Sequence, residues 1–65
     1  MEKDKRPYVT VYRPVAGYKA VLMSWEEDLG MHTPWNTGMF AYRTREEAVA
    51  EAKGWAEAEE IEYRD

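Results

Sequence analysis

Alternating hydrophobic and polar positions predict two strands in the first half of the chain. Residues 8–12 are β-branched or aromatic throughout, and their alternation separates two valines from the tyrosines and the threonine. Residues 18–25 form a second such run, but apolar side chains occur on both of its sides, so the pattern leaves open which side is buried. Pro14 and Gly17 lie between the runs and are typical of a turn, because proline fixes φ and glycine permits positive φ. The pattern therefore predicts an antiparallel hairpin.

The next segment, residues 26–38, shows neither a strand period nor a helix period. We interpret it as a long irregular loop, which in a compact domain is often a place where function resides. Residues 39–43 read Met-Phe-Ala-Tyr-Arg and predict a short third strand.

The clearest local signal is the start of a helix. Thr44 followed three residues later by Glu47 forms a capping box, in which each side chain satisfies a backbone amide that the helix leaves unpaired. The helix is predicted to run to about Glu59, with an apolar stripe that faces the sheet. This stripe consists of Ala48, Val49, Ala52, Trp55 and Ala56. Trp55 and Phe40 are expected to supply the large side chains of the core.

These elements predict a two-layer α+β fold, in which a three-stranded antiparallel sheet packs on one α-helix. The alternation of residues 61–63 is compatible with a fourth short strand at the C-terminus. Residues 1–7 are polar and are expected to form a flexible N-terminal segment, followed by a single domain over residues 8–65.

The composition limits the classes of protein to which the chain can belong. The chain has 65 residues, no cysteine and a net charge of −4, which excludes a disulfide scaffold and a thiolate zinc site and fits a reducing cytoplasm. No apolar run approaches the roughly 20 residues that span a bilayer, so no membrane association is expected. The charge is uneven: residues 1–45 carry seven bases and five acids, whereas residues 46–65 carry eight acids and two bases. This acidic balance disfavours general nucleic-acid binding.

The residue types that carry catalysis are sparse. The chain has one histidine and lacks a nucleophile motif and a phosphate-binding glycine loop, so we expect neither an enzyme nor a cofactor. Glu26, Glu27, Asp28 and His32 lie close together in sequence and are compatible with a divalent cation site. The alternative, which we favour, is a solvated acidic segment that keeps a sheet edge from pairing, and no metal site is assigned.

The aromatic residues point instead to an interaction surface. Nine large rings occur in 65 residues, and a single helix covers only one face of a sheet. Exposed Tyr, Trp and Met side chains on the uncovered face have the composition of a protein-binding patch. The residues proposed for partner binding are Tyr12, Met23, Trp25, His32, Trp35, Asn36, Glu59, Glu60 and Glu62. The alternative is that this aromatic face stacks the bases of a nucleic acid or a nucleotide.

Two features of the helix bear on partners. Ala50, Gly54 and Ala58 recur at four-residue spacing and are compatible either with a homodimer contact or with an alanine-rich solvent face. Glutamates crowd the end of the helix, where negative charge opposes the helix dipole. This crowding indicates either a basic partner or a surface that favours solubility.

The motifs Pro-Trp-Asn-Thr-Gly at residues 34–38 and Tyr-Arg-Thr-Arg-Glu-Glu-Ala at residues 42–48 carry a resemblance. Over roughly its C-terminal half, the chain resembles small uncharacterised proteins of bacteria and their phages. The resemblance implies a sheet-plus-helix fold and brings no activity with it. Folds of this kind also include AP2-like DNA-binding domains, in which a three-stranded sheet reads the major groove.

The sequence as a whole predicts a small non-enzymatic protein-interaction module of the cytoplasm. We expect a regulator or inhibitor, encoded by a bacterium or a phage, that docks on a larger protein. Binding of a nucleic acid or nucleotide by the aromatic sheet face is the alternative.

Overall fold

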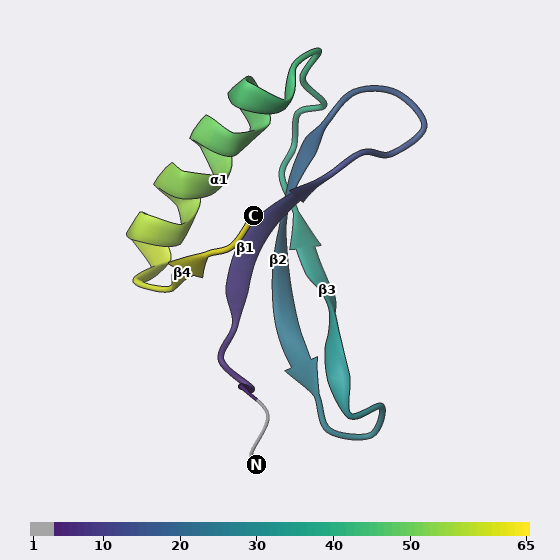
Figure 1. Ribbon diagram of the computed structural model, residues 1–65, viewed down its shortest axis with the longest axis vertical. Helices are drawn as coiled ribbons and strands as arrows, with labels where there is room; N and C mark the ends of the chain where they lie inside the picture. The colour runs from purple at the N-terminus through teal and green to yellow at the C-terminus, as the bar shows by residue number, and fades with distance from the viewer. Residues whose placement is uncertain (1–3) are drawn as a thin grey trace.

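A four-stranded sheet and one helix form two layers in the computed structural model, which describes residues 4–65 (Figure 1). The elements in chain order are β1 (Tyr8–Tyr12), β2 (Lys19–Glu26), β3 (Met31–Thr37), α1 (Arg45–Glu59) and β4 (Glu62–Tyr63). The strand order is β3-β2-β1-β4, with antiparallel pairing of β2 to both neighbours and parallel pairing of β4 to β1. The predicted α+β fold, with its fourth short strand, is confirmed.

The position of the third strand differs from the prediction. It lies at Met31–Thr37, inside the segment expected to be an irregular loop, whereas residues 39–43 contribute only an isolated bridge between Tyr18 and Tyr42. A tight turn joins β2 to β3, in which Gly30 adopts a φ of 65° and donates its amide to the Glu26 carbonyl oxygen. Pro34 is tolerated within β3 because this strand forms an edge of the sheet, where a missing amide donor breaks no ladder.

The helix begins and ends at the predicted residues. Thr44 and Glu47 form the capping box, and Glu60 terminates the helix in the left-handed conformation. The face of α1 that meets the sheet is built from small side chains, because Ala48, Ala52 and Ala56 are its buried residues.

The core lies between α1 and the β1–β2 part of the sheet. Val9 and Ala20 are fully buried against the helix, and Val11, Leu22, Trp55, Ile61 and Tyr63 surround them while half-buried. Figure 1 shows that α1 lies beside β4 and β1, whereas β3 extends beyond the helix. Phe40 was expected in the core but is 60% exposed, because residues 38–44 pass the end of the sheet instead of entering it.

Backbone contacts fix the connection between β3 and α1. Tyr18 and Tyr42 exchange two backbone hydrogen bonds of 2.7 and 2.8 Å, and the Gly38 amide donates to the Ala20 carbonyl oxygen at 2.8 Å. Gly17 turns the preceding loop with a φ of 82°, and a Cβ atom there would lie 2.7 Å from the Tyr42 carbonyl oxygen. This close approach holds the β1–β2 loop against the segment that leads into the helix.

The N-terminal segment lies beside the sheet over its described part. Residues 1–3 of the segment predicted to be flexible fall outside the described residues. Asp4, Lys5 and Arg6 each form an ion pair or hydrogen bond with other parts of the chain. Across the described range, no helix has both the length and the apolar character needed to cross a membrane.

Candidate interaction surface on the open sheet face

The face of the sheet opposite α1 is called the open face here, because no helix covers it within residues 4–65. Residues that pair directly across strands share a face, so the register assigns its members. The open face consists of Tyr8, Thr10, Tyr12, Lys19, Val21, Met23, Trp25, His32, Pro34 and Thr37. Large aromatic and sulfur-containing side chains thus lie on the uncovered side, and small ones lie under the helix.

A hollow of about 320 Å³ lies in the middle of the open face. Its lining is formed by Thr10, Tyr12, Val21, Met23, Pro34 and Thr37. Val21 at its floor is only 4% exposed although no helix lies above it, because the longer neighbouring side chains surround it. A concave apolar surface of this kind accepts an apolar side chain rather than a charged one.

Three rings pack together on the open face between the hollow and the β2–β3 turn. The His32 ring lies edge-on to Tyr8, with centroids 4.8 Å apart, and to Trp25, with centroids 5.2 Å apart. His32 Nε2 also donates to the Arg6 carbonyl oxygen at 2.8 Å. His32 therefore acts as a structural link between the sheet and the N-terminal segment.

Cationic side chains cover these rings. The Lys5 ammonium lies 5.6 Å from the centroid of Trp25, and the Arg64 guanidinium lies 4.5 Å from the centroid of Tyr8. Both cations are also neutralised, since Lys5 pairs with Glu27 at 3.3 Å and Arg64 pairs with Asp4 and Glu62. The rings and their ion pairs leave little uncompensated charge at this part of the face.

The carboxyl group of Asp4 holds the N-terminal segment in place. Arg6 donates from its backbone amide and from two side-chain nitrogens to Asp4, each at 3.0 Å. These hydrogen bonds, foremost those from the Arg6 side chain, hold the pKa of Asp4 well below its usual range. The pKa of Asp65 is lowered in the same way, mainly because the Arg45 side chain donates a hydrogen bond to its carboxylate. The Tyr63 hydroxyl donates a second one.

The structure brings together some of the predicted partner-binding residues and separates others. Tyr12, Met23, Trp25 and His32 all lie on the open face, and Glu62 lies beside Tyr8 at its β4 edge. Trp35 is the extra residue of a β-bulge between Pro34 and Asn36 and is 77% exposed. Asn36 pairs with Leu22, so it belongs to the opposite side of the sheet. Glu59 and Glu60 lie at the end of α1, away from the hollow.

Sequence reasoning did not single out Thr10, Val21, Pro34 and Thr37, which complete the surface. The two-residue alternation along β1 and β2 contains this information, but only after one residue has been assigned to the helix side.

The acidic residues considered for a cation site are dispersed. Glu27 pairs with Lys5, Glu26 accepts the Asp28 amide at 3.3 Å, and His32 is enclosed by rings. In the part of the chain that the structure describes, no three His, Asp or Glu side chains converge on a point that would hold a metal ion.

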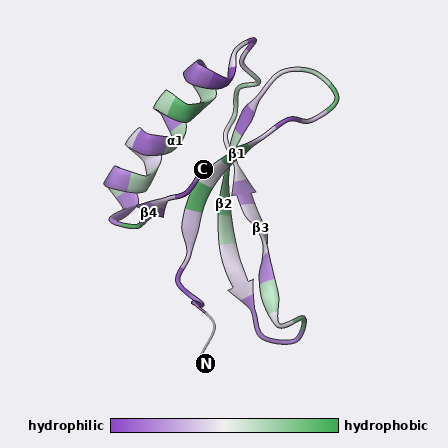
Figure 2. Ribbon diagram, viewed as in Figure 1, coloured by the Kyte–Doolittle hydropathy of each residue, from purple (hydrophilic) through white to green (hydrophobic). Residues whose placement is uncertain are grey.

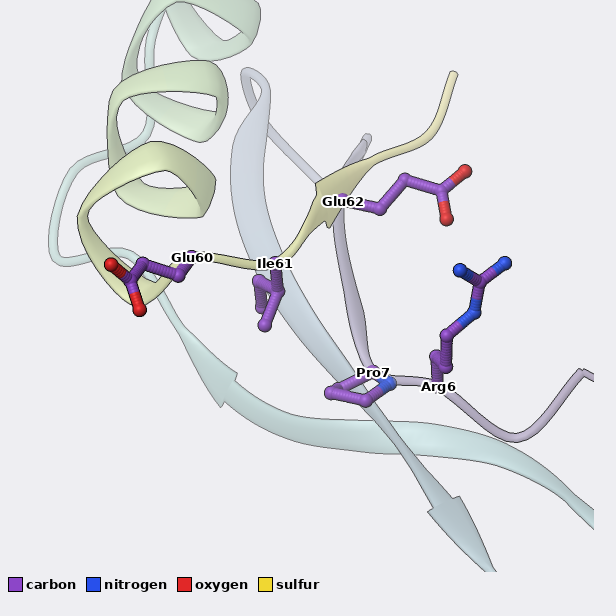
Figure 3. A pocket seen from close by; sticks show the side chains of 5 residues that line it. All are labelled: Arg6, Pro7, Glu60, Ile61 and Glu62. Carbon is purple, nitrogen blue, oxygen red and sulfur yellow. The ribbon is translucent and has the colours of Figure 1, made fainter.

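A second hollow, of about 300 Å³, separates the N-terminal segment from the end of the helix (Figure 3). Its lining residues are Arg6, Pro7, Glu60, Ile61 and Glu62. Figure 3 shows the Arg6 and Glu62 side chains on one side of this hollow and the Glu60 side chain directed away on the other. The carboxylates expected to meet a partner therefore do not form one continuous acidic patch.

Charge separates the two layers of the molecule. No acidic residue occurs between Tyr8 and Trp25 or between Leu29 and Arg45, so the three main strands carry none except Glu26 at the end of β2. In Figure 2, hydrophilic residues mark much of α1 and the β2–β3 turn. The open face is thus aromatic and apolar with a few cations, whereas α1 and the residues that follow it carry eight of the 13 acids.

Comparisons of the chain with known protein families, with curated proteins and with solved structures found no match.

Proposed function

We propose that the chain is a non-enzymatic protein-interaction module that docks on a larger protein through its open face. The observation that carries this proposal is the apolar hollow of about 320 Å³ on a sheet face that α1 leaves uncovered. Tyr12 and Met23 at its rim are side chains typical of protein interfaces. Their large contact area and the surrounding rings favour a partner side chain that is aliphatic or aromatic.

The finer parts of the proposal concern biological role. We propose a regulator or inhibitor of bacterial or phage origin that acts in the cytoplasm. A small chain with one uncovered face has room to bind and block a site on a larger protein. In an inhibitory version, the glutamates at the end of α1 and in β4 contact a basic site of the partner. Binding of that kind weakens as salt is raised, because exposed charges are screened.

Site-specific photo-crosslinking in the native host tests the docking surface. A benzophenone amino acid in place of Tyr12 keeps an aromatic ring at the rim of the hollow. The same group in place of Lys53, which is exposed on α1, is the control. We expect an adduct with one larger protein from position 12 and none from position 53. Equal adducts from both positions, or none from position 12, would contradict docking through the open face.

Nucleic-acid binding by the same face is the second candidate, favoured by the position of the acids. The five glutamates of α1 lie in the other layer, and β1, β2 and β3 carry only Glu26. It ranks below protein binding because Lys5, Arg6 and Arg64, the cations nearest the rings, are already paired with carboxylates. Titration of tryptophan fluorescence with single-stranded oligonucleotides decides between the two, since base stacking on Trp25 quenches its emission.

A further inference from the structure

Residues 4–7, here called the strap, leave the sheet instead of extending β1. The pairing of β1 with β2 starts only after Pro7, which has no amide proton with which to lengthen the ladder. The strap reaches the open face through Lys5, whose ammonium lies 5.6 Å from the centroid of Trp25, and through the Arg6 carbonyl oxygen. The chain therefore partly covers the part of its own open face that holds the three packed rings, here called the ring end.

Three contacts attach the strap, each to a different part of the fold. The contacts are those of Lys5 with Glu27 in the β2–β3 turn, of Arg6 with His32 in β3, and of Asp4 with Arg64 after β4. The side chains of the first pair are 53% and 71% exposed. Exposed ion pairs stabilise a contact only slightly, because water and dissolved salt compete with them.

The strap contributes no side chain to the core. All four of its residues, Pro7 included, are exposed. A segment that is held by exposed polar contacts opens more readily than strands that share a buried core. Opening of the strap therefore leaves the two layers of the fold intact.

One buried donor is unsatisfied while the strap is closed. Nε1 of Trp25 has less than 1 Å² of exposed surface and no hydrogen-bond partner among the described residues. Such a donor raises the free energy of the form in which it occurs, because it has lost its hydrogen bond to water. A movement of the strap that admits water to Trp25 recovers this hydrogen bond, which favours opening.

We propose that the strap is an autoinhibitory cover that closes the ring end of the open face and opens reversibly. Opening removes the Lys5 ammonium from Trp25 and frees His32 Nε2 from the Arg6 carbonyl oxygen. The uncovered ring end then offers an aromatic surface with two N–H donors, for which the strap and a docking partner compete. This competition rests on the proposed docking through the open face, whereas the opening of the strap does not.

Fluorine NMR of the full chain labelled with 5-fluorotryptophan tests the opening. The three tryptophans give three resonances, and the shift of each between H₂O and D₂O measures its exposure. Glu27→Lys turns the attraction of Lys5 into repulsion and is expected to raise the open fraction at least about twofold, the equivalent of one exposed ion pair. The Trp25 resonance then moves toward the exposure of Trp35, which is 77% exposed. The resonance of Trp55, which packs against the core, stays unchanged and shows that the fold is intact.

Asp28→Lys is the matched control. Asp28 is exposed in the same turn and bonds through its amide to Glu26, and its replacement by lysine changes the charge equally. We expect this variant to keep the wild-type Trp25 resonance and Lys5→Gln to move it as Glu27→Lys does. Raising sodium chloride from about 0.05 to about 0.5 M is expected to expose Trp25 in the wild type. A Trp25 resonance that ignores both Glu27→Lys and salt, or that Asp28→Lys moves equally, overturns the strap.

Photo-crosslinking from position 12 separates the strap from the docking. If both proposals hold, Glu27→Lys raises the yield of the adduct with the larger protein, and Asp28→Lys does not. A Trp25 resonance that reports opening while position 12 gives no adduct in any variant supports the strap and refutes the docking. Adducts of equal yield from the wild type and both variants, with the same responsive resonance, support the docking and refute its control by the strap.

Discussion

The two faces of the sheet are built from side chains of different size. Beneath α1 the sheet contributes Val9 and Ala20. The helix contributes only alanines to its buried side, so the two layers approach closely. The open face presents tyrosine, methionine, tryptophan and histidine, and these side chains pack on one another. The small residues therefore hold the fold together, and the large residues form the accessible surface.

This division explains why a 65-residue chain keeps so many rings outside its core. The centre of the helix–sheet contact holds only small side chains, and the rings of Trp55 and Tyr63 pack around it while half-buried. One extra methylene group in a well-packed interface already costs stability. The rings on the open face reduce their own exposure through edge-on contacts and through the Lys5 and Arg64 side chains above them. The comparison predicts that substitutions on the covered face affect folding most. Substitutions of half-buried rings on the open face affect folding less, and those of exposed residues affect mainly binding.

The largest effect is expected from a charge placed under the helix. Ala52 is fully buried, so Ala52→Asp buries a carboxylate without a partner and costs about 3–5 kcal/mol. That amount is comparable with the whole stability of a domain of this size, and the variant is expected to be unfolded at 25 °C. Circular dichroism during thermal or urea unfolding measures the loss.

Ala50→Asp is the matched control for this prediction. Ala50 lies on the same helix but is exposed, so the same change there costs only helix propensity, about 0.7 kcal/mol. Equal destabilisation by Ala52→Asp and Ala50→Asp would show that burial under the helix does not contribute to the stability of the fold.

A smaller effect is expected from the two tryptophans at the β2–β3 edge. Trp25→Ala removes a half-buried ring together with its contacts to His32 and Lys5, and it is expected to cost about 2 kcal/mol. Trp35→Ala removes a ring that is 77% exposed and is expected to change the free energy of unfolding by less than about 0.5 kcal/mol. Urea denaturation of both variants gives the two values.

The same pair separates stability from binding. If Trp35 contacts the partner, Trp35→Ala weakens crosslinking while the unfolding curve stays unchanged. Comparable unfolding penalties for both tryptophans would contradict the difference in burial between them.

The sequence predicts the parts of this fold that depend on local chemistry. The capping box at Thr44, the hairpin and the helix limits all follow from side chains within a few positions of each other. The third strand was misplaced because its signal is not local. The bulge at Trp35 interrupts the two-residue alternation, and Pro34 is acceptable only because β3 lies at the edge of the sheet.

The open face was predictable in composition but not in detail. Alternation alone places Met23 and Trp25 on one side of β2, yet both sides of that strand are apolar, so the buried side follows only from the helix position. The packing of His32 between Tyr8 and Trp25 depends on the register between β2 and β3. That register could not be predicted, because the third strand was expected at residues 39–43.

A modest gain in stability is expected from the solvent side of the helix. A Cβ atom at Gly54 meets nothing within 4 Å, so Gly54→Ala relieves the backbone entropy cost and stabilises the chain by about 0.5–1 kcal/mol. The variant also tests the homodimer contact considered for the helix. If the copies meet through Ala50, Gly54 and Ala58, the added methyl groups weaken association. If these residues form an alanine-rich solvent face, the unfolding midpoint rises and the oligomeric state stays unchanged.

The smallest effect concerns the N-terminal segment that partly covers the open face near the β2–β3 turn. The pKa of Asp4 is depressed in the folded chain, so its ion pairs contribute fully above its ordinary pKa, about 3.9, and are lost as the pH falls toward the folded value. We expect the unfolding midpoint of the wild type to fall more between about pH 5 and about pH 2.5 than that of Asp4→Asn. The difference is expected to shrink in high salt, because Asp4, Arg6 and Arg64 are partly exposed to solvent. Superimposable pH profiles for the two proteins would mean that the segment does not depend on Asp4. The contacts of Lys5 with Trp25 and of His32 with Arg6 would then be sufficient to hold it on the open face.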